Sequence, residues 1–160
     1  MGDKNYLVTS AEQGDIFEIH PKRKKEIARR LFLKAMKYTY GMDIWADQPV
    51  YKSAEFKDGK AYVTFTAGEI GLSPIDSDLE GFELAGEDKV FHPAKARLDG
   101  DRYRIVVSCP EVTEPVAVRY GMKNWSEATL FNCFGIPASP YRSDNWIRYD
   151  NYRKRTYSSA

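Results

Sequence analysis

Apolar residues recur with a helical period in the first quarter of the chain. From Ile27 to Tyr38 they follow one another at spacings of three and four residues, which places them on one face of an α-helix. Pro21 stands where a first helical residue tolerates its missing N–H, and Gly41 supplies a stop. The pattern predicts one long helix between them, preceded by a short strand at 6–9 and a loop. The basic cluster 22–30 is expected on the solvated face of that helix.

Beyond residue 47 the pattern changes from helical to period two. Apolar and polar residues alternate clearly in 62–66 and 102–108, as they do in strands with one buried face. Two Asp-Gly pairs, Asp58-Gly59 and Asp99-Gly100, precede these runs and predict tight hairpin turns, because glycine accepts the positive φ that such turns require. Further strands are expected at 82–85, 90–98, 116–120 and 129–132.

This change of period sets the predicted domain organisation. Short, closely spaced strands separated by turn residues favour an antiparallel β-sandwich over a parallel sheet. We therefore expect an α+β protein, with a strand or loop and one long helix in residues 1–47 and a β-sandwich domain in residues 48–160.

Composition and charge narrow the function classes. Hydrophobic residues make up 42% of the 160 and charged residues 29%, which is typical of a globular chain that can bury its own core. The sequence has 24 basic and 23 acidic side chains and hence a net charge of +1. So small a net charge gives no reason to expect a nucleic acid or an anionic membrane as partner. No apolar run approaches the roughly 18 residues of a membrane span, and the start lacks the apolar core of a signal peptide.

The cysteine content predicts neither a metal site nor redox catalysis. Cys109 and Cys133 lie in separate apolar runs without CxxC spacing, so two buried free thiols are expected, with one disulfide as the alternative. We expect no cofactor and no metal.

One stretch has catalytic character, the segment 14–21 that leads into the predicted helix. It contains His20 with two acids close by in sequence, Asp15 and Glu18. An imidazole can take a proton from a serine hydroxyl and return it to a leaving group, provided that a carboxylate or carbonyl fixes its tautomer. Taken alone, a histidine beside acids at a helix start is more often a cap or a surface contact.

Several blocks of the sequence resemble the sialate O-acetylesterase family. GDIFEIHPKRKKEIARRL is similar to the end of its SGNH-type hydrolase domain, where a GD..DIHP.NK pattern carries the catalytic histidine. The family's carboxy-terminal β-domain is matched in order by PVYKSAEFKDGKAYVTF, GLSP, GFELAGEDKVFHPAKARLDGD, EPVAVRYG and LFNCFGIPASPYRSDNW. The resemblance implies that residues 1–47 are the remnant of an α/β SGNH hydrolase domain and that His20 is the general base, oriented by Asp15 or Glu18. It also suggests a periplasmic or secreted location.

The sequence departs from the family pattern at three points. Phe17 stands where many SGNH hydrolases have the aspartate three residues before the histidine, so the orienting role falls to Asp15, Glu18 or a backbone carbonyl. Glu18 and Arg23 replace the usual Asp and Asn. No GDS-like nucleophile block and no G-x-N-D block occur in the sequence, so the attacking serine and the oxyanion donors would have to come from elsewhere.

Several other residues can be interpreted as either structural or functional. Arg119, Arg142 and Asp144 could bind a sialic acid carboxylate, but a salt bridge between the last loop and the sheet is favoured. His92 is expected to be structural. Three tryptophans are candidates for stacking on a sugar or for domain packing: Trp45, Trp125 and Trp146.

Two functions from different classes remain open. The first is a part of an esterase that hydrolyses O-acetyl esters on sialic acid or related glycans, whose nucleophile lies on a separate chain or outside the sequence, and which is inactive alone. The second is a glycan-binding or structural β-sandwich without catalysis. Neither requires a nucleic acid or a membrane.

Overall fold

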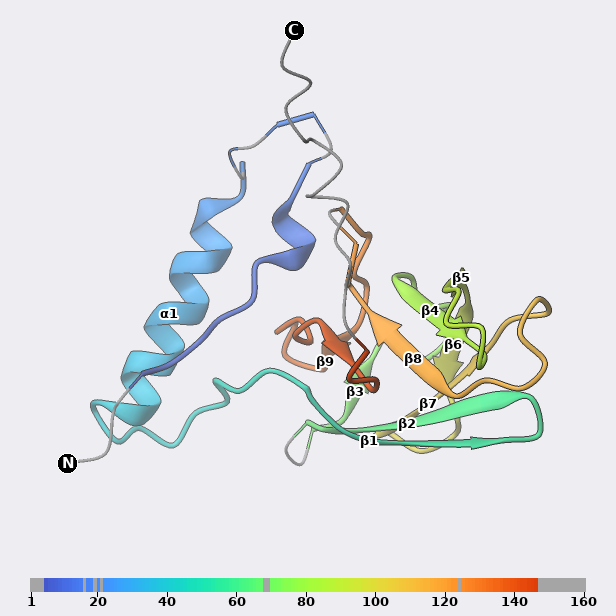
Figure 1. Ribbon diagram of the computed structural model, residues 1–160. Coiled ribbons are helices and arrows are strands. Elements are labelled where there is room, and N and C mark those ends of the chain that lie inside the picture. The colour runs from blue at the N-terminus through green and yellow to red at the C-terminus, as the bar shows by residue number, and fades with distance from the viewer. Residues whose placement is uncertain are drawn as a thin grey trace, which may run out of the picture.

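The structure is a computed structural model that describes residues 5–15, 17–18, 20, 22–67, 70–123 and 125–146. One helix is followed by antiparallel sheets that pack together, as the sequence predicts (Figure 1). The predicted α+β class, with a β-sandwich after the helix, is confirmed.

The helix, α1 (Lys24–Tyr38), is shorter at its start than predicted. Its first turn follows Arg23 rather than Pro21, which lies outside the described residues. At its end the N–H of Thr39 donates to the Ala35 carbonyl at 2.8 Å, and Gly41 then takes a φ of 70°. The positive φ at Gly41 turns the chain away from the helix, as the sequence suggested.

The segment before α1 forms no strand, contrary to the prediction for residues 6–9. It runs alongside α1 on the side of the sandwich and contains one turn of 3-10 helix, η1 (Ala11–Gln13) (Figure 1). The Thr9 carbonyl accepts a hydrogen bond from Arg30 of α1 instead of a ladder bond from another strand. A strand needs such a ladder, and here the side chain of a helix takes the place of a neighbouring strand.

The first sheet has four antiparallel strands in the order β1-β2-β7-β6. They are β1 (Val50–Lys57), β2 (Lys60–Thr66), β7 (Arg104–Ser108) and β6 (Lys95–Leu98). In β2 the inner positions Ala61, Val63 and Phe65 are buried while their neighbours are not. The period-two pattern in the sequence therefore marks the face of this sheet that packs inward.

The second sheet has the order β10-β8-β4-β5, and a two-stranded sheet pairs β3 with β9. The strands of the second sheet are β10 (Tyr141–Arg142), β8 (Ala117–Tyr120), β4 (Phe82–Ala85) and β5 (His92–Pro93). The short pair is β3 (Leu72–Ser73) with β9 (Phe131–Asn132). The expected strand at 90–98 is thus two strands, β5 and β6, which belong to different sheets.

The core lies between the two larger sheets. Phe65 of β2 meets the Tyr141 ring of β10 edge to face at 5.4 Å between centroids, and Tyr51 of β1 stacks on Tyr141 at 4.5 Å. Phe82 and Tyr120 meet at 4.7 Å within the second sheet. Much of the high aromatic content therefore packs the sandwich, as aromatic side chains commonly do in sheets.

The two Asp-Gly pairs form turns of different length. Asp58 and Gly59 have φ values of 51° and 71° and join β1 to β2 directly, with Lys57 opposite Lys60. This is the predicted tight hairpin. The Asp99-Gly100 pair instead opens a longer loop, which ends where Arg104 begins β7.

Both cysteines are free, but only one is buried. Cys109 lies in the core, whereas Cys133 is exposed, which corrects the expectation of two buried thiols. Among the described residues no three His, Cys, Asp or Glu side chains gather in a way that could hold a metal ion. In the same part of the chain, no helix combines the length and the apolarity needed to cross a bilayer.

Candidate functional site

The loop that carries His20 is held together by its two acids. One carboxylate oxygen of Asp15 accepts the Phe17 N–H at 2.9 Å, and the other pairs with the Lys22 ammonium at 3.3 Å. Glu18 accepts the backbone N–H of His20 at 3.3 Å. Both predicted acids therefore bind the loop that presents His20.

The charge of Asp15 is favoured by this arrangement. The Phe17 N–H, and after it the Lys22 side chain, lower the pKa of Asp15 below its ordinary value. A hydrogen bond to the charged form acts in this direction because it stabilises the carboxylate alone. Asp15 is therefore an anionic loop residue at neutral pH.

His20 itself is exposed. Within the described residues, no side chain and no carbonyl forms a hydrogen bond with its ring; the contact with Glu18 involves the backbone N–H only. The described residues thus bring Asp15, Glu18 and His20 into one loop without joining either acid to the imidazole. The ring is open to a group that comes from outside this part of the chain.

A pocket of about 500 Å³ lies between this amino-terminal segment and the loop that precedes β9. A Cβ added at Gly14 would lie 3.7 Å from Cδ1 of Trp125, which shows how closely the two segments approach. Arg23, three residues after His20, belongs to the pocket wall and donates to the Glu12 carbonyl at 3.3 Å. The pocket and the His20 loop are therefore adjacent along the chain.

Charged and polar side chains line the pocket on the helix side, and some of them are buried. Arg30 is 3% exposed; its guanidinium pairs with Glu12 and donates to the Thr9 carbonyl at 2.8 Å. Three buried atoms in this wall have no hydrogen-bond partner among the described residues: Glu12 Oε2, Gln13 Oε1 and Arg30 Nε. Such atoms are costly unless water or a ligand satisfies them.

The tryptophans divide into packing residues and one pocket residue. Trp45 stacks on Phe134 at 5.8 Å between centroids, and Trp146 meets Phe91 at 5.7 Å. Trp125 is 40% exposed and lines the pocket. Of the three candidates for sugar stacking, Trp125 therefore has the most suitable setting.

Arg119 of the second sheet forms the salt bridge to the last loop that the sequence favoured. Arg119 holds Asp144 through two hydrogen bonds of 2.8 Å, and its guanidinium lies 3.8 Å from the centroid of the Phe91 ring. Arg142 donates to the Trp146 carbonyl at 3.2 Å. His92 is half-buried on β5, opposite Leu84 of β4. Arg119, Asp144 and Arg142 thus connect the last loop with the second sheet.

Sequence reasoning missed the residues of the pocket wall. Glu12 and Arg30 are 18 positions apart, and the basic cluster 22–30 was predicted to be solvated throughout. Lys22, Lys24 and Lys25 do lie in solvent, but Arg30 is buried. The helical period gave no signal for this, because Arg30 lies away from the apolar face that carries Ala28 and Leu31 and is therefore expected in solvent.

One solved structure is similar to most of this chain. A crystal structure of XAC1771, a novel carbohydrate acetylesterase from Xanthomonas citri, matches 84% of this chain with 40% identical residues and a TM-score of 0.73. The chain is similar to one portion of a carbohydrate acetylesterase. It spans 31% of that acetylesterase chain. No protein-family model matches the chain, and no curated protein does.

Proposed function

We propose that this chain is the part of a carbohydrate O-acetylesterase that contributes the general base, His20, and that the complete enzyme acts on O-acetyl esters of sialic acid or a related glycan. The observation that carries the proposal is the 40% identity to a portion of a carbohydrate acetylesterase, together with an exposed histidine in a loop held by Asp15 and Glu18.

In the proposed reaction His20 accepts one proton and then returns it in each of the two steps. His20 accepts the proton of a serine hydroxyl while the serine oxygen attacks the acetyl carbonyl, and it returns that proton to the sugar oxygen as the ester bond breaks. Water then attacks the acetyl-serine with the same histidine as base, which releases acetate and restores the serine. Since the sequence has no GDS-like block, a second polypeptide portion would carry the serine and the oxyanion donors.

Complementation tests whether His20 of this chain acts with a serine on a second portion of the enzyme. The portion of the Xanthomonas citri acetylesterase that this chain does not match would be co-expressed with the wild-type chain, with His20→Ala, or with His92→Ala as the control histidine. Hydrolysis of p-nitrophenyl acetate and of an O-acetylated sialic acid would be measured. Activity is expected with wild type and with His92→Ala, and a loss of at least 100-fold with His20→Ala. Equal activity of wild type and His20→Ala would remove His20 from the mechanism.

A second candidate function, glycan binding without catalysis, is favoured by the pocket beside Trp125. An exposed indole in a pocket that Arg23 and Glu26 also line suits a sugar ring, which offers C–H groups to the aromatic face and hydroxyls to the polar side chains. Calorimetry with the sialic acid and its O-acetylated form would test it on the full chain. Trp125→Ala should abolish binding, and Trp45→Ala, at the same 40% exposure but stacked on Phe134, should not. If wild type binds neither sugar, this second function fails.

A further inference from the structure

Helix α1 places its charged and apolar sides the opposite way round from an ordinary surface helix. The side that faces the amino-terminal segment holds Arg30, which is 3% exposed. The same side carries Lys34 and Lys37, whose ammonium groups both pair with Asp47 at 2.5 Å. Ion pairs and hydrogen bonds therefore connect this side of α1 to the rest of the molecule.

The outward side of α1 carries an apolar stripe, made by Ala28, Leu31, Phe32 and Ala35. Their spacing of three, four and seven residues from the first member puts them on one face. Leu31 is 49% exposed and Phe32 59% exposed, Ala28 is exposed and Ala35 is half-buried. In Figure 1 the side of α1 turned away from the sandwich has no described element against it. A helix face of this kind is normally buried against another element.

The position of the stripe limits what can cover it. It lies on the helix that begins four residues after His20, so whatever packs on the stripe also comes close to the His20 loop. The similar acetylesterase has more than this chain, which spans 31% of it. The rest of such an enzyme is the portion that would bring a serine to His20.

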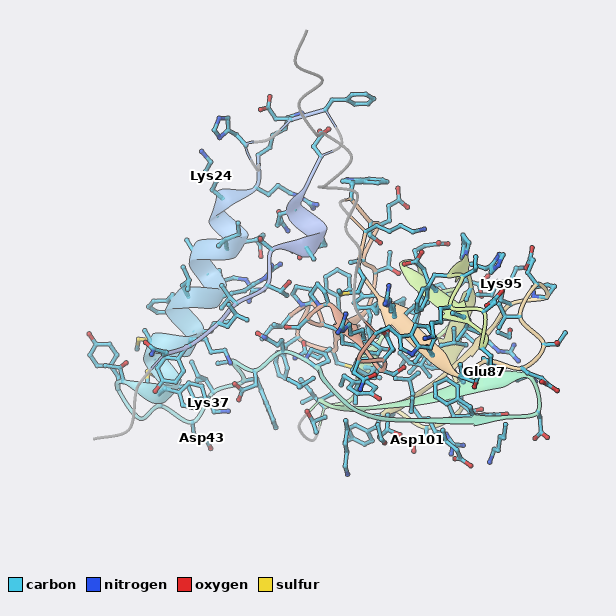
Figure 2. All side chains as sticks on the ribbon, viewed as in Figure 1. Lys24, Lys37, Asp43, Glu87, Lys95 and Asp101 are labelled. Carbon is cyan, nitrogen blue, oxygen red and sulfur yellow. The ribbon has the colours of Figure 1, made fainter. Side chains whose placement is uncertain are left out.

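We propose that the stripe Ala28–Leu31–Phe32–Ala35 is the docking surface for the serine-bearing portion of the acetylesterase; this inference rests on the proposed function. The surface of the serine-bearing portion that contacts the stripe is then apolar, and it carries carboxylates where it meets the start of α1. There Lys24 and Lys25 are exposed beside the stripe, and Figure 2 shows Lys24 at that end of the helix. A second copy of this chain could also cover the stripe, but it would bring no serine block.

The test is co-purification of the full chain with the unmatched portion of the Xanthomonas citri acetylesterase, both expressed in one cell. The test variant is Leu31→Glu with Phe32→Glu, since glutamate keeps the helix propensity and replaces the apolar contact by charge. The matched control is Ile75→Glu with Val90→Glu on the sandwich, where the exposures are 57% and 52%. The wild-type chain and the control should co-purify with the acetylesterase portion, and the test variant should retain less than a tenth of it.

Three outcomes would overturn the proposal. These are failure of the wild-type chain to co-purify, equal recovery with the test variant, and a wild-type dimer in sedimentation that the test variant alone dissociates. His20→Ala separates this inference from the proposed function: it should co-purify like wild type and yet lack activity. If His20→Ala retains activity while the Leu31 and Phe32 variant loses binding, docking stands and the role of His20 fails.

Discussion

At the residue scale, the guanidinium of Arg30 connects the helix to the segment that leads into the His20 loop. It lies in the interior, pairs with Glu12 and donates to the Thr9 carbonyl at 2.8 Å. The Glu12 carbonyl in turn accepts from Arg23, which follows the loop. This one buried charge therefore holds both sides of the loop that presents His20.

Replacing Arg30 by alanine should loosen this connection strongly. The change leaves the Glu12 carboxylate buried without its partner, which typically costs about 3 kcal/mol or more. Chemical denaturation followed by circular dichroism at a helix-sensitive wavelength should show α1 lost at lower denaturant. Arg29→Ala is the control, because its bond to Glu26 is half-exposed and three residues apart on the helix, a contact worth about 0.5 kcal/mol at most. Equal effects of the two changes would contradict a structural role for Arg30.

Arg30 also shows what the sequence could not reveal about the site. His20, Asp15 and Glu18 could be singled out because they are close together in sequence and because their segment resembles the family's histidine motif. The contact between Glu12 and Arg30 depends on how the amino-terminal segment folds back along α1, and no local pattern encodes that path. The basic residues around Arg30 make it look solvated, although the helical period separates it from them.

At the element scale, the end of α1 is fixed to the connection that precedes β1. Asp47 accepts hydrogen bonds from Lys34 and Lys37 at 2.5 Å and from the Tyr38 hydroxyl at 2.6 Å. Its carbonyl accepts from Asn132 of β9 at 2.9 Å. Through Asp47, the connection between α1 and β1 therefore joins the helix to the sandwich.

This cluster should make the helix sensitive to acid. Burial alone would raise the pKa of Asp47, but hydrogen bonds from Lys34, Lys37 and Tyr38 outweigh it and lower the pKa to about 2. Since the folded-state pKa is below the ordinary 3.8, the stabilisation is complete above 3.8 and is lost as the pH falls toward 2. Thermal melts from pH 7 to 2 should show a steeper loss for wild type than for Asp47→Asn.

The half-exposed setting of Asp47 keeps the expected size modest, roughly 0.5–1 kcal/mol at neutral pH. Other carboxylates also titrate in acid, among them Asp144, whose pKa is lowered by its bonds to Arg119. The difference between wild type and Asp47→Asn isolates the cluster. Parallel curves over the whole range would show that Asp47 contributes no pH-dependent stability.

The strands could be predicted where one face is buried and the run is long enough to show a period. β2 and β7 alternate over five residues or more, and both were found. β3 and β10 have two residues each, too few for any period, and they exist because distant segments pair with them. The edge strand β1 was implied only by the hairpin turn at Asp58-Gly59, since most of its residues are exposed and its own alternation of apolar and polar residues is weak.

At the scale of the whole molecule, the sandwich carries its own core, whereas α1 makes ion pairs on its inner side and has an apolar stripe on its outer side. The buried residues that form the main core cluster extend from Ala61 to Tyr141. From the first 47 residues, Ala11 packs against this cluster, and Trp45 stacks on Phe134 nearby. The two predicted units thus differ in how far each can stand alone.

We expect residues 48–160 to fold without the first unit, because a core formed within one stretch of chain supplies most of the apolar burial that folding requires. Circular dichroism should give a β spectrum and one cooperative melt. Ala46 is 2% exposed, and the Asp47 carbonyl accepts a hydrogen bond from Asn132. Because a fragment that begins at residue 43 keeps both contacts, it should melt at a higher temperature than one that begins at residue 48. A fragment 48–160 without a cooperative transition, while 43–160 melts cooperatively, would move the domain boundary upstream. If neither fragment melts cooperatively, the sandwich needs the amino-terminal segment to fold, and the division at residue 47 is wrong.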